Sequence, residues 1–360
     1  MRHAFATHAR RRTRPGRHVA MLVLLGFGPA LAETPDPPVP LFDASRLNDP
    51  PIALQIEAPW RQLRRAPEDE GPYAATLELG GQEAALELTV EKRGVSRQEL
   101  CSMPPIRLRF HQDRVEGTVF EGNRSVKVVT HCRSGRQWEQ WVMLEMLAYR
   151  LYSALTDMSF RVRPATIVYL DNERNRSDGP RIAFLIEDDR LVGNRHGLDK
   201  VDAAEVQPSD LPAVDTSIFM LFQYMIGNVD FSPLSAIDGE CCHNAKLIGN
   251  EESLDPLYAV PYDFDSSGWV DTDYAAPPEN LPIRDVRQRL FRGFCEHNGG
   301  LPTARDLFLA REEDLKRVIE SETRLSSGNR RKASRYLDDF FRVLNDDDLF
   351  QRLITEECRS

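Results

Sequence analysis

Residues 73–92 read YAATLELGGQEAALELTVEK, two runs of alternating apolar and polar side chains on either side of a glycine pair. Alternation with a period of two is typical of β-strands that bury one face. Gly80 and Gly81 give the chain the conformational freedom that a tight turn needs. The stretch therefore predicts a β-hairpin whose strands cover 73–79 and 84–92, and it places a β-sheet in the first half of the chain.

Further short apolar runs beyond the hairpin extend the predicted sheet. Residues 106–110 alternate Ile, Leu and Phe with two arginines, as a half-buried strand does. Residues 138–156 instead repeat apolar side chains at helical spacing. The first half is therefore expected to be a mainly antiparallel sheet with one helix, with its remaining strands at 125–130, 163–170 and 181–186.

The second half of the chain has a different, mainly helical pattern. Residues 214–226 carry a heavy apolar load at helical spacing, and Pro302 and Gly328 separate later helical segments. Two short apolar runs between them are predicted as strands at 245–248 and 258–260. The later helices are predicted at 283–295, 303–309, 312–321 and 329–344.

The N-terminal segment has the order of a secretory signal peptide. Residues 1–18 hold many arginines and no acid, residues 19–27 are apolar, and Ala30-Leu31-Ala32 closes the run with small residues. The apolar run is short for a bilayer-spanning helix, although a membrane anchor is the alternative. We expect a signal peptide at 1–32, a flexible leader rich in Pro, Asp and Glu at 33–70, and a periplasmic or secreted protein.

Composition limits the partners of this protein. The net charge is −10, and removal of the basic N-terminal segment makes the remainder more acidic. Nucleic acid is therefore not expected as a partner, because binding to phosphates requires a basic face. No second long apolar stretch occurs, so we expect no stable membrane span after removal of the signal.

Six cysteines lie outside the signal segment, and their pairing cannot be assigned from the sequence alone. An exported protein can hold disulfides. Zinc is the competing interpretation, but no CxxC pair supports it, and Cys241-Cys242-His243 is too tight for a tetrahedral site. The sequence thus favours structural disulfides or buried thiols at Cys101, Cys132, Cys241, Cys242, Cys295 and Cys358.

Polar side chains gather around the two short strands of the second half. Asp230 follows the apolar helix, Asn244 precedes one strand, and Asp263 and Asp265 follow the other. If the two strands pair as a hairpin, Asn244 and Asp263 meet at the same end. An amide and two carboxylates suit Mg²⁺, which takes few protein oxygens. Phosphoryl transfer depends on such a set, with one carboxylate orienting the accepting hydroxyl.

These motifs resemble two kinase families. Gly227-Asn228-Val229-Asp230, followed by His243-Asn244 and Pro261-Tyr262-Asp263, looks like the kinase core of HipA-type enzymes. Pro261–Asp265 is also similar to the Pro-aromatic-Asp-x-Asp element of CotH-like spore-coat kinases, and Arg93–Arg97 to their Arg-Gly-rich motif. The chain is similar as well to exported bacterial proteins with a Pro-Tyr-Asp-Phe-Asp stretch and a later Arg-Gly-Phe-Cys, here Arg292–Cys295.

The resemblance implies an α+β, protein-kinase-like two-lobed fold, with a sheet-rich N-lobe at 71–188 and a mainly helical C-lobe at 189–360. It implies an exported kinase-like protein that transfers a phosphoryl group from ATP, with Mg²⁺, to an acceptor that the sequence does not identify. Asp230 would be the catalytic residue. Asn244, Asp263 and Asp265 would bind the metal, and the nucleotide would be held by Lys127, Glu145, Arg93 and Arg97.

One departure and two alternatives accompany this interpretation. Asp and Asn lie about five residues apart in ordinary protein kinases, whereas fourteen positions separate Asp230 from Asn244, so residues 231–243 must loop out. The missing Gly-rich loop leaves open a catalytically inactive binding or envelope protein. A calcium-stabilised exported protein is also open, because residues 263–268 place oxygen ligands at alternate positions before a glycine.

Overall fold

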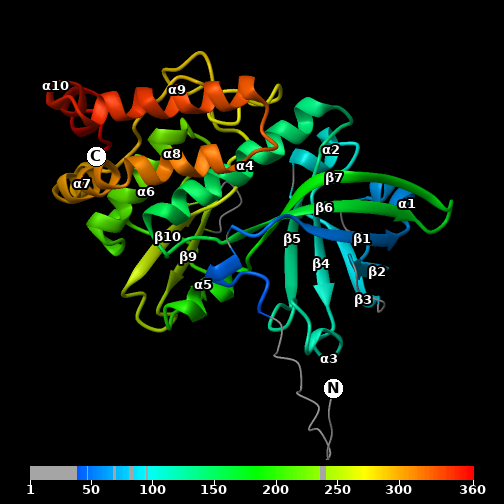
Figure 1. The fold of residues 1–360 in the computed structure, drawn as a ribbon. Helices are drawn as coiled ribbons and strands as arrows, with labels where there is room; N and C mark the ends of the chain where they lie inside the picture. Colours follow the sequence, from blue (N-terminus) through cyan, green and yellow to red (C-terminus); the bar gives the residue numbers. More distant parts are fainter. Residues whose placement is uncertain (1–38, 47, 68–69, 81–84, 95, 236–240) are drawn as a thin grey trace, which may run out of the picture. The chain divides into compact units, whose positions relative to one another are not determined.

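The computed structural model of the protein describes residues 39–46, 48–67, 70–80, 85–94, 96–235 and 241–360 (Figure 1). The predicted signal peptide at 1–32 and the start of the predicted leader lie outside these residues.

Seven strands close into a barrel in the order β1-β2-β3-β4-β5-β7-β6. Neighbouring strands are antiparallel except β1 and β6, which run parallel. Alternate side chains fill the interior, and Ile56, Leu77 and Val90 are completely buried there, as the period of two requires. The strands are β1 (Ile52–Ala58), β2 (Tyr73–Leu79), β3 (Leu86–Lys92), β4 (Ile106–Phe110), β5 (Ser125–Val129), β6 (Val162–Asp171) and β7 (Arg176–Ile186).

Strand β1 lies in the segment whose composition predicts a flexible leader. Residues 33–70 are rich in Pro and acids, yet β1 and the following helix α1 (Trp60–Arg65) form within them. The reason is the short alternating run IALQIEA, whose Leu54, Ile56 and Ala58 are buried. Seven alternating residues are enough for a strand when partners exist on both sides.

The expectation of a protein-kinase-like two-lobed fold is wrong. The structure has a barrel-containing α+β fold, in which a closed seven-stranded mixed barrel is combined with helices. Closure comes from β1, which pairs with β2 on one side and with β6 on the other. This parallel pairing joins residues more than a hundred positions apart, and a local alternation pattern cannot predict it.

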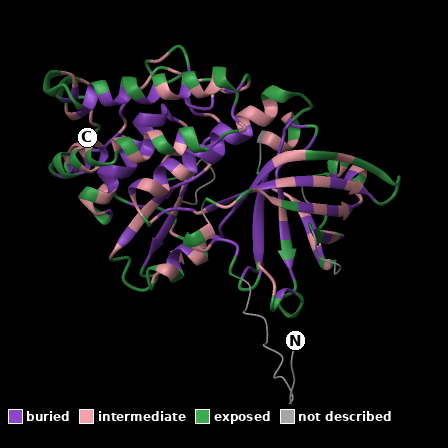
Figure 2. Cartoon of the chain, viewed as in Figure 1, coloured by how far each residue is buried: buried purple, intermediate pink, exposed green. Residues whose placement is uncertain are grey.

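A second, three-stranded sheet and the longer helices make up much of the remaining chain, and Figure 2 shows how much of α4 and α6 is buried. The sheet order is β10-β9-β8, with β8 (Asp199–Val201), β9 (Ala245–Gly249) and β10 (Leu257–Pro261). The helices after α1 are α2 (Ser96–Leu100), α3 (Gln112–Val115), α4 (Arg136–Leu155), α5 (Asp189–Arg195), α6 (Ala213–Ile226), α7 (Leu301–Ala310), α8 (Glu312–Ser321), α9 (Ser327–Leu344) and α10 (Asp347–Phe350).

The helix predicted at 283–295 does not form. This segment consists mainly of turns and irregular backbone. Two of its arginines hold it against the end of α6 and the residues that follow. Arg289 donates to the carbonyl oxygen of Met225 at 3.1 Å, and Arg292 donates to that of Phe231 at 3.1 Å. These hydrogen bonds satisfy backbone carbonyls near a helix terminus, so tertiary contacts override the local helical pattern.

Disulfides are present, as the sequence predicts. Cys101 bonds to Cys132, Cys295 bonds to Cys358, and the adjacent Cys241 and Cys242 are joined to each other. Such bonds are compatible with a secreted or extracellular protein. In the described part of the chain, no helix is both long and apolar enough to cross a membrane.

Candidate functional site

The hairpin of β9 and β10 carries two predicted site residues at one end. Ala245 lies opposite Pro261 in the last pair, and the Tyr262 amide donates to the Asn244 carbonyl oxygen at 3.0 Å. Asn244 and Asp263 flank this end, and both adopt positive φ angles, 48° and 58°. Asn and Asp tolerate this left-handed conformation better than other side chains, which suits these two positions to the tight turns at the hairpin end.

Asp230 is brought to Asn244 by the end of α6. The helix stops at Gly227, whose φ is 61°, and the Asn228 side chain then accepts the Asp230 amide at 3.0 Å. Asn244 donates through Nδ2 to the Asp230 carbonyl oxygen at 2.6 Å and to Oδ2 at 3.1 Å. The structure therefore places these two predicted residues in direct contact.

The long segment between Asp230 and Asn244 closes at its base. Ser232 and His243 exchange two backbone hydrogen bonds, at 2.9 and 3.0 Å. The chain thus leaves and returns at the same point, so the fourteen-position separation does not keep Asp230 from Asn244. Residues 236–240, at the centre of the segment, lie outside the described residues.

His243 belongs to the site, although the sequence indicated no chemical role for it. Its Nε2 lies 2.7 Å from Oδ1 of Asp230. This hydrogen bond raises the pKa of His243, because the carboxylate stabilises the protonated ring. The signal that could have identified His243 is its position directly before Asn244.

The negative charge of Asp263 is only partly balanced by neighbouring cations. Burial and the nearby Asp265 raise its pKa, while Arg97 and Arg93 oppose the rise. Its backbone amide donates to the Tyr149 hydroxyl at 2.9 Å. No side chain among the described residues donates a hydrogen bond to its carboxylate. A half-buried acid in this state favours the approach of a cation.

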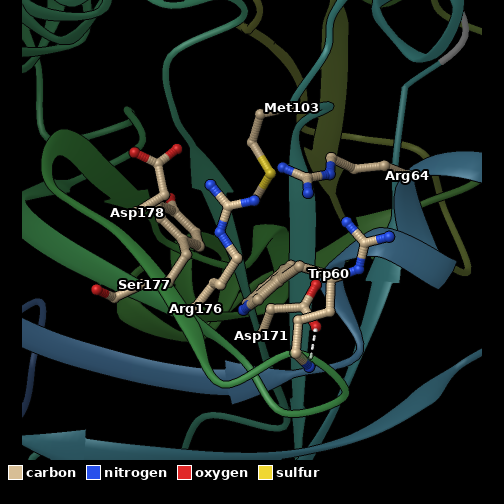
Figure 3. A pocket seen from close by; sticks show the side chains of 9 residues that line it. Trp60, Arg64, Met103, Asp171, Arg176, Ser177 and Asp178 are labelled. Atoms are coloured by element: carbon tan, nitrogen blue, oxygen red, sulfur yellow. Dashed lines mark hydrogen bonds between the residues drawn. The ribbon is translucent and has the colours of Figure 1, made fainter.

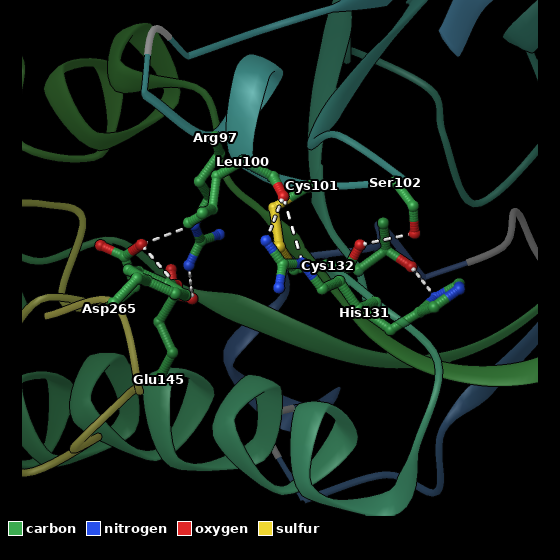
Figure 4. Close-up of a disulfide and its surroundings, with 11 residues drawn as sticks. Arg97, Leu100, Cys101, Ser102, His131, Cys132, Glu145 and Asp265 are labelled. Carbon is green, nitrogen blue, oxygen red and sulfur yellow. Dashed lines mark hydrogen bonds and ion pairs between the residues drawn. A yellow bond between two sulfur atoms is a disulfide. The ribbon is translucent and has the colours of Figure 1, made fainter.

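Asp265, Arg97 and Glu145 form a buried ionic cluster (Figure 4). Arg97 lies on α2 and contacts Asp265 at 2.5 Å and Glu145 at 2.7 Å. The Tyr274 hydroxyl adds a hydrogen bond to Asp265 at 2.8 Å. Burial acts to raise the pKa of Asp265, but Arg97 lowers it below the ordinary value. Burial raises the pKa of Glu145 although Arg97 opposes the change.

Cationic side chains surround Tyr262, the residue before Asp263. The Lys127 ammonium lies 4.7 Å from the Tyr262 ring centroid, and that of Lys246 lies 5.8 Å from it. Arg93 donates to the Tyr262 hydroxyl at 2.7 Å. Lys127 is only 7% exposed, and burial lowers its pKa to about 8. Burial and the neighbouring Lys127 also lower the pKa of Lys246.

The predicted nucleotide-binding residues thus fall into two groups. Glu145 and Arg97 pair with each other, whereas Lys127 and Arg93 gather at Tyr262 with Lys246. The sequence missed Lys246, whose only signal is its place on the strand after Asn244. The described residues contain no cluster of three His, Cys, Asp or Glu side chains that could hold a metal. Asn244, whose amide oxygen is also a possible ligand, is outside this set of side-chain types.

Comparison with known proteins adds no family to this description. The chain matches no protein-family model, and no curated protein is similar to it in sequence at a significant level.

Proposed function

We propose that this protein transfers a phosphoryl group from a nucleoside triphosphate, with ATP as the expected donor, to a hydroxyl group of an acceptor. The main support for the proposal is that an acidic group and a cationic group of side chains meet around Tyr262. Asp230, Asn244 and Asp263 are gathered at the end of the β9–β10 hairpin, and Lys127, Lys246 and Arg93 surround the adjacent ring. The proposal rests on this site and does not depend on a kinase-like fold.

The acidic group fits a magnesium ion. Asp263 is a carboxylate with no side-chain hydrogen-bond donor among the described residues. Asn244 uses Nδ2 to hold Asp230, which leaves its Oδ1 as an oxygen ligand. These are the hard oxygen ligands that Mg²⁺ prefers. When bound, the metal would supply charge neutralisation at the phosphate oxygens.

The cationic group fits the phosphates of the donor. Lys127 and Lys246 lie over one ring without a described acid in hydrogen-bond contact, and their pKa values are lowered by burial. A buried ammonium group beside a half-buried one is unfavourable in the absence of an anion. A triphosphate would restore their charge balance and raise these pKa values.

Asp230 is the group placed to receive the proton. Its side chain is 40% exposed, and His243 and Asn244 fix its orientation. The acceptor hydroxyl oxygen would attack the γ-phosphorus while its proton passes to Asp230. The bond from the γ-phosphorus to the bridging oxygen would break, leaving a nucleoside diphosphate. Asp265, held by Arg97 and Tyr274, would position the turn that contains Asp263.

Calorimetry tests the proposal directly. We expect ATP to bind the wild-type chain with magnesium and at least tenfold more weakly with EDTA. Lys127→Met should weaken ATP binding in both conditions, whereas Asp263→Asn should remove only the effect of magnesium. Asp306→Asn, an exposed change on α7, is the matched control. The absence of magnesium-dependent ATP binding by the wild type would refute the proposal.

A second measurement separates transfer from binding. Radiolabelled ATP should yield labelled product with an extract of the exported fraction, and Asp230→Asn should abolish labelling while retaining ATP binding. Magnesium-dependent binding with no transfer to any acceptor would instead support the inactive binding protein. Thermal stabilisation by calcium alone would support the calcium-stabilised alternative.

A further inference from the structure

A polar pocket of about 270 Å³ lies between α1 and the β6–β7 hairpin of the barrel (Figure 3). None of its lining residues belongs to the candidate site around Tyr262. Trp60 and Arg64 come from α1, and Tyr169 and Arg176 come from the hairpin strands. The pocket is therefore a separate feature that the proposed function leaves unexplained.

Three arginines without acidic partners line this pocket. Arg64, Arg174 and Arg176 form no ion pair through their guanidinium groups with any described residue. Figure 3 shows the guanidinium groups of Arg64 and Arg176 directed into the pocket. All three residues are exposed, so water screens their mutual repulsion, but their like charges still make the pocket attractive to an anion. A bound anion would turn that repulsion into attraction.

The two acids that line the pocket already accept hydrogen bonds from other groups of the protein. Asp171 accepts the backbone amides of Arg61 at 2.9 Å and Arg174 at 3.2 Å. Asp178 accepts Arg181 at 2.6 Å. Neutral amides thus satisfy the oxygens of Asp171, and Arg181 pairs with Asp178. The lining holds three arginines against these two carboxylates, so it keeps an excess of positive charge.

The floor of the pocket is aromatic and fixed. Trp60 packs edge-on against Tyr169 with ring centroids 5.1 Å apart, and both side chains are buried. The indole N–H donates to the Ile56 carbonyl oxygen at 3.1 Å, and the Tyr169 hydroxyl donates to Thr130 at 2.6 Å. Trp60 and Tyr169 are only 2% and 3% exposed, and their polar atoms are satisfied, so together they close the bottom of the pocket beneath the arginines.

We propose that this pocket binds a small organic phosphate ester, with the phosphate held by Arg64, Arg174 and Arg176 and the organic part in the remaining volume of the pocket. Guanidinium groups match phosphate oxygens in paired hydrogen bonds. The volume lies just below the usual range of ligand pockets, which favours a ligand no larger than a sugar phosphate. This inference does not depend on the proposed phosphoryl transfer.

Calorimetry at low ionic strength with glucose 6-phosphate as the probe tests the inference. We expect glucose 6-phosphate to bind, inorganic phosphate to bind more weakly and glucose not to bind. The double variant Arg64→Gln/Arg176→Gln should lose at least tenfold in affinity. The matched control, Arg331→Gln/Arg335→Gln, changes two exposed arginines of α9 and should bind as the wild type does.

Three outcomes would overturn the inference. Equal loss in the pocket and control variants would show that general positive charge attracts the probe. Loss in Lys127→Met, with retention in the pocket variant, would assign the binding to the candidate site. Binding of citrate in preference to the phosphate ester would show that the ligand class is wrong. Circular dichroism of each variant checks that loss of binding is not loss of folding.

Discussion

Lys127 is a residue whose burial reduces stability. Its pKa is lowered to about 8 by burial, so the folded state resists protonation that the unfolded state accepts. A shift of this size corresponds to a folding penalty of about 3 kcal/mol at neutral pH. A substitution that removes the ammonium group relieves this penalty but also loses the cation–π contact with the Tyr262 ring, which contributes about 1 kcal/mol. Lys127→Met should therefore raise the free energy of unfolding by about 2 kcal/mol while it weakens ATP binding.

The lowered pKa of Lys127 also predicts how the stability of the wild type changes with pH. Between pH 8 and about 10 the unfolded chain binds more protons at this position than the folded chain, so wild-type stability rises with pH. The advantage of Lys127→Met should narrow over the same interval in urea denaturation. Lys332→Met, at an exposed position of α9, is the control. A destabilised Lys127→Met variant would contradict the prediction.

The pair of Asp230 and His243 makes a second prediction for single residues. The hydrogen bond to Asp230 raises the pKa of His243. This interaction therefore contributes fully to stability below the ordinary histidine pKa, and the contribution is lost as pH rises through the raised pKa. Asp230→Asn should return the pKa of His243 toward about 6.5. NMR titration of the ring protons measures this change.

The titration has an internal comparison. His131 is buried, its pKa is lowered to about 4, and its nearest acid is Asp178. Its resonance should therefore not respond to Asp230→Asn. If His243 keeps a raised pKa in that variant, a different group holds its proton, and the arrangement described for Asp230 is incorrect.

At the scale of elements, the end of α6 sets the position of Asp230. Gly227 has a φ of 61°, and a Cβ added there would lie 2.0 Å from the buried hydroxyl of Tyr336. That hydroxyl is held by the Arg287 carbonyl oxygen at 3.0 Å. Gly227→Ala should lower the free energy of unfolding by about 2 kcal/mol or more, from backbone strain and this overlap.

The same change should disturb the site, because Asn228 and Asp230 directly follow the helix end. We expect Gly227→Ala to reduce magnesium-dependent ATP binding at temperatures where the variant is still folded. Gly299→Ala is a matched control, since a Cβ there meets no atom within 4 Å. Equal stability of the two variants in thermal denaturation would rule out this account of the helix end.

At the scale of the whole molecule, two disulfides make a matched pair. Cys101–Cys132 closes 31 residues and Cys295–Cys358 closes 63, and each should stabilise the fold by about 3 to 4 kcal/mol. Cys101 follows the helix that carries Arg97, and Cys132 follows the strand that carries Lys127. Replacing Cys101 and Cys132 by Ser should therefore lower both stability and ATP affinity.

Replacing Cys295 and Cys358 by Ser should lower stability alone, because that bond ties the C-terminal segment to residues outside the site. Differential scanning calorimetry and ATP titration on the two double variants measure both effects. Equal losses of ATP affinity would show that the first disulfide has no particular connection with the site.

Local pattern was informative for elements whose partners are close in the chain. The alternation at 73–92 and 106–110 predicted β2, β3 and β4 closely, and the apolar stripe of 138–156 predicted most of α4. The pairing of β9 with β10 was also predictable, and with it the proximity of Asn244 and Asp263. Side-chain period and short loops determine these features.

Tertiary structure alone decided the rest. The barrel closes because β1 finds β6 across more than a hundred residues, and no local signal distinguishes that run from a flexible leader. His243 and Lys246 join the site through contacts with Asp230 and Tyr262, and Glu145 pairs with Arg97. The sequence by itself determined many of the strands, the longer helices and which polar residues cluster. Long-range pairing decided the fold and the partners of each charge, because these depend on burial and distance rather than on spacing along the chain.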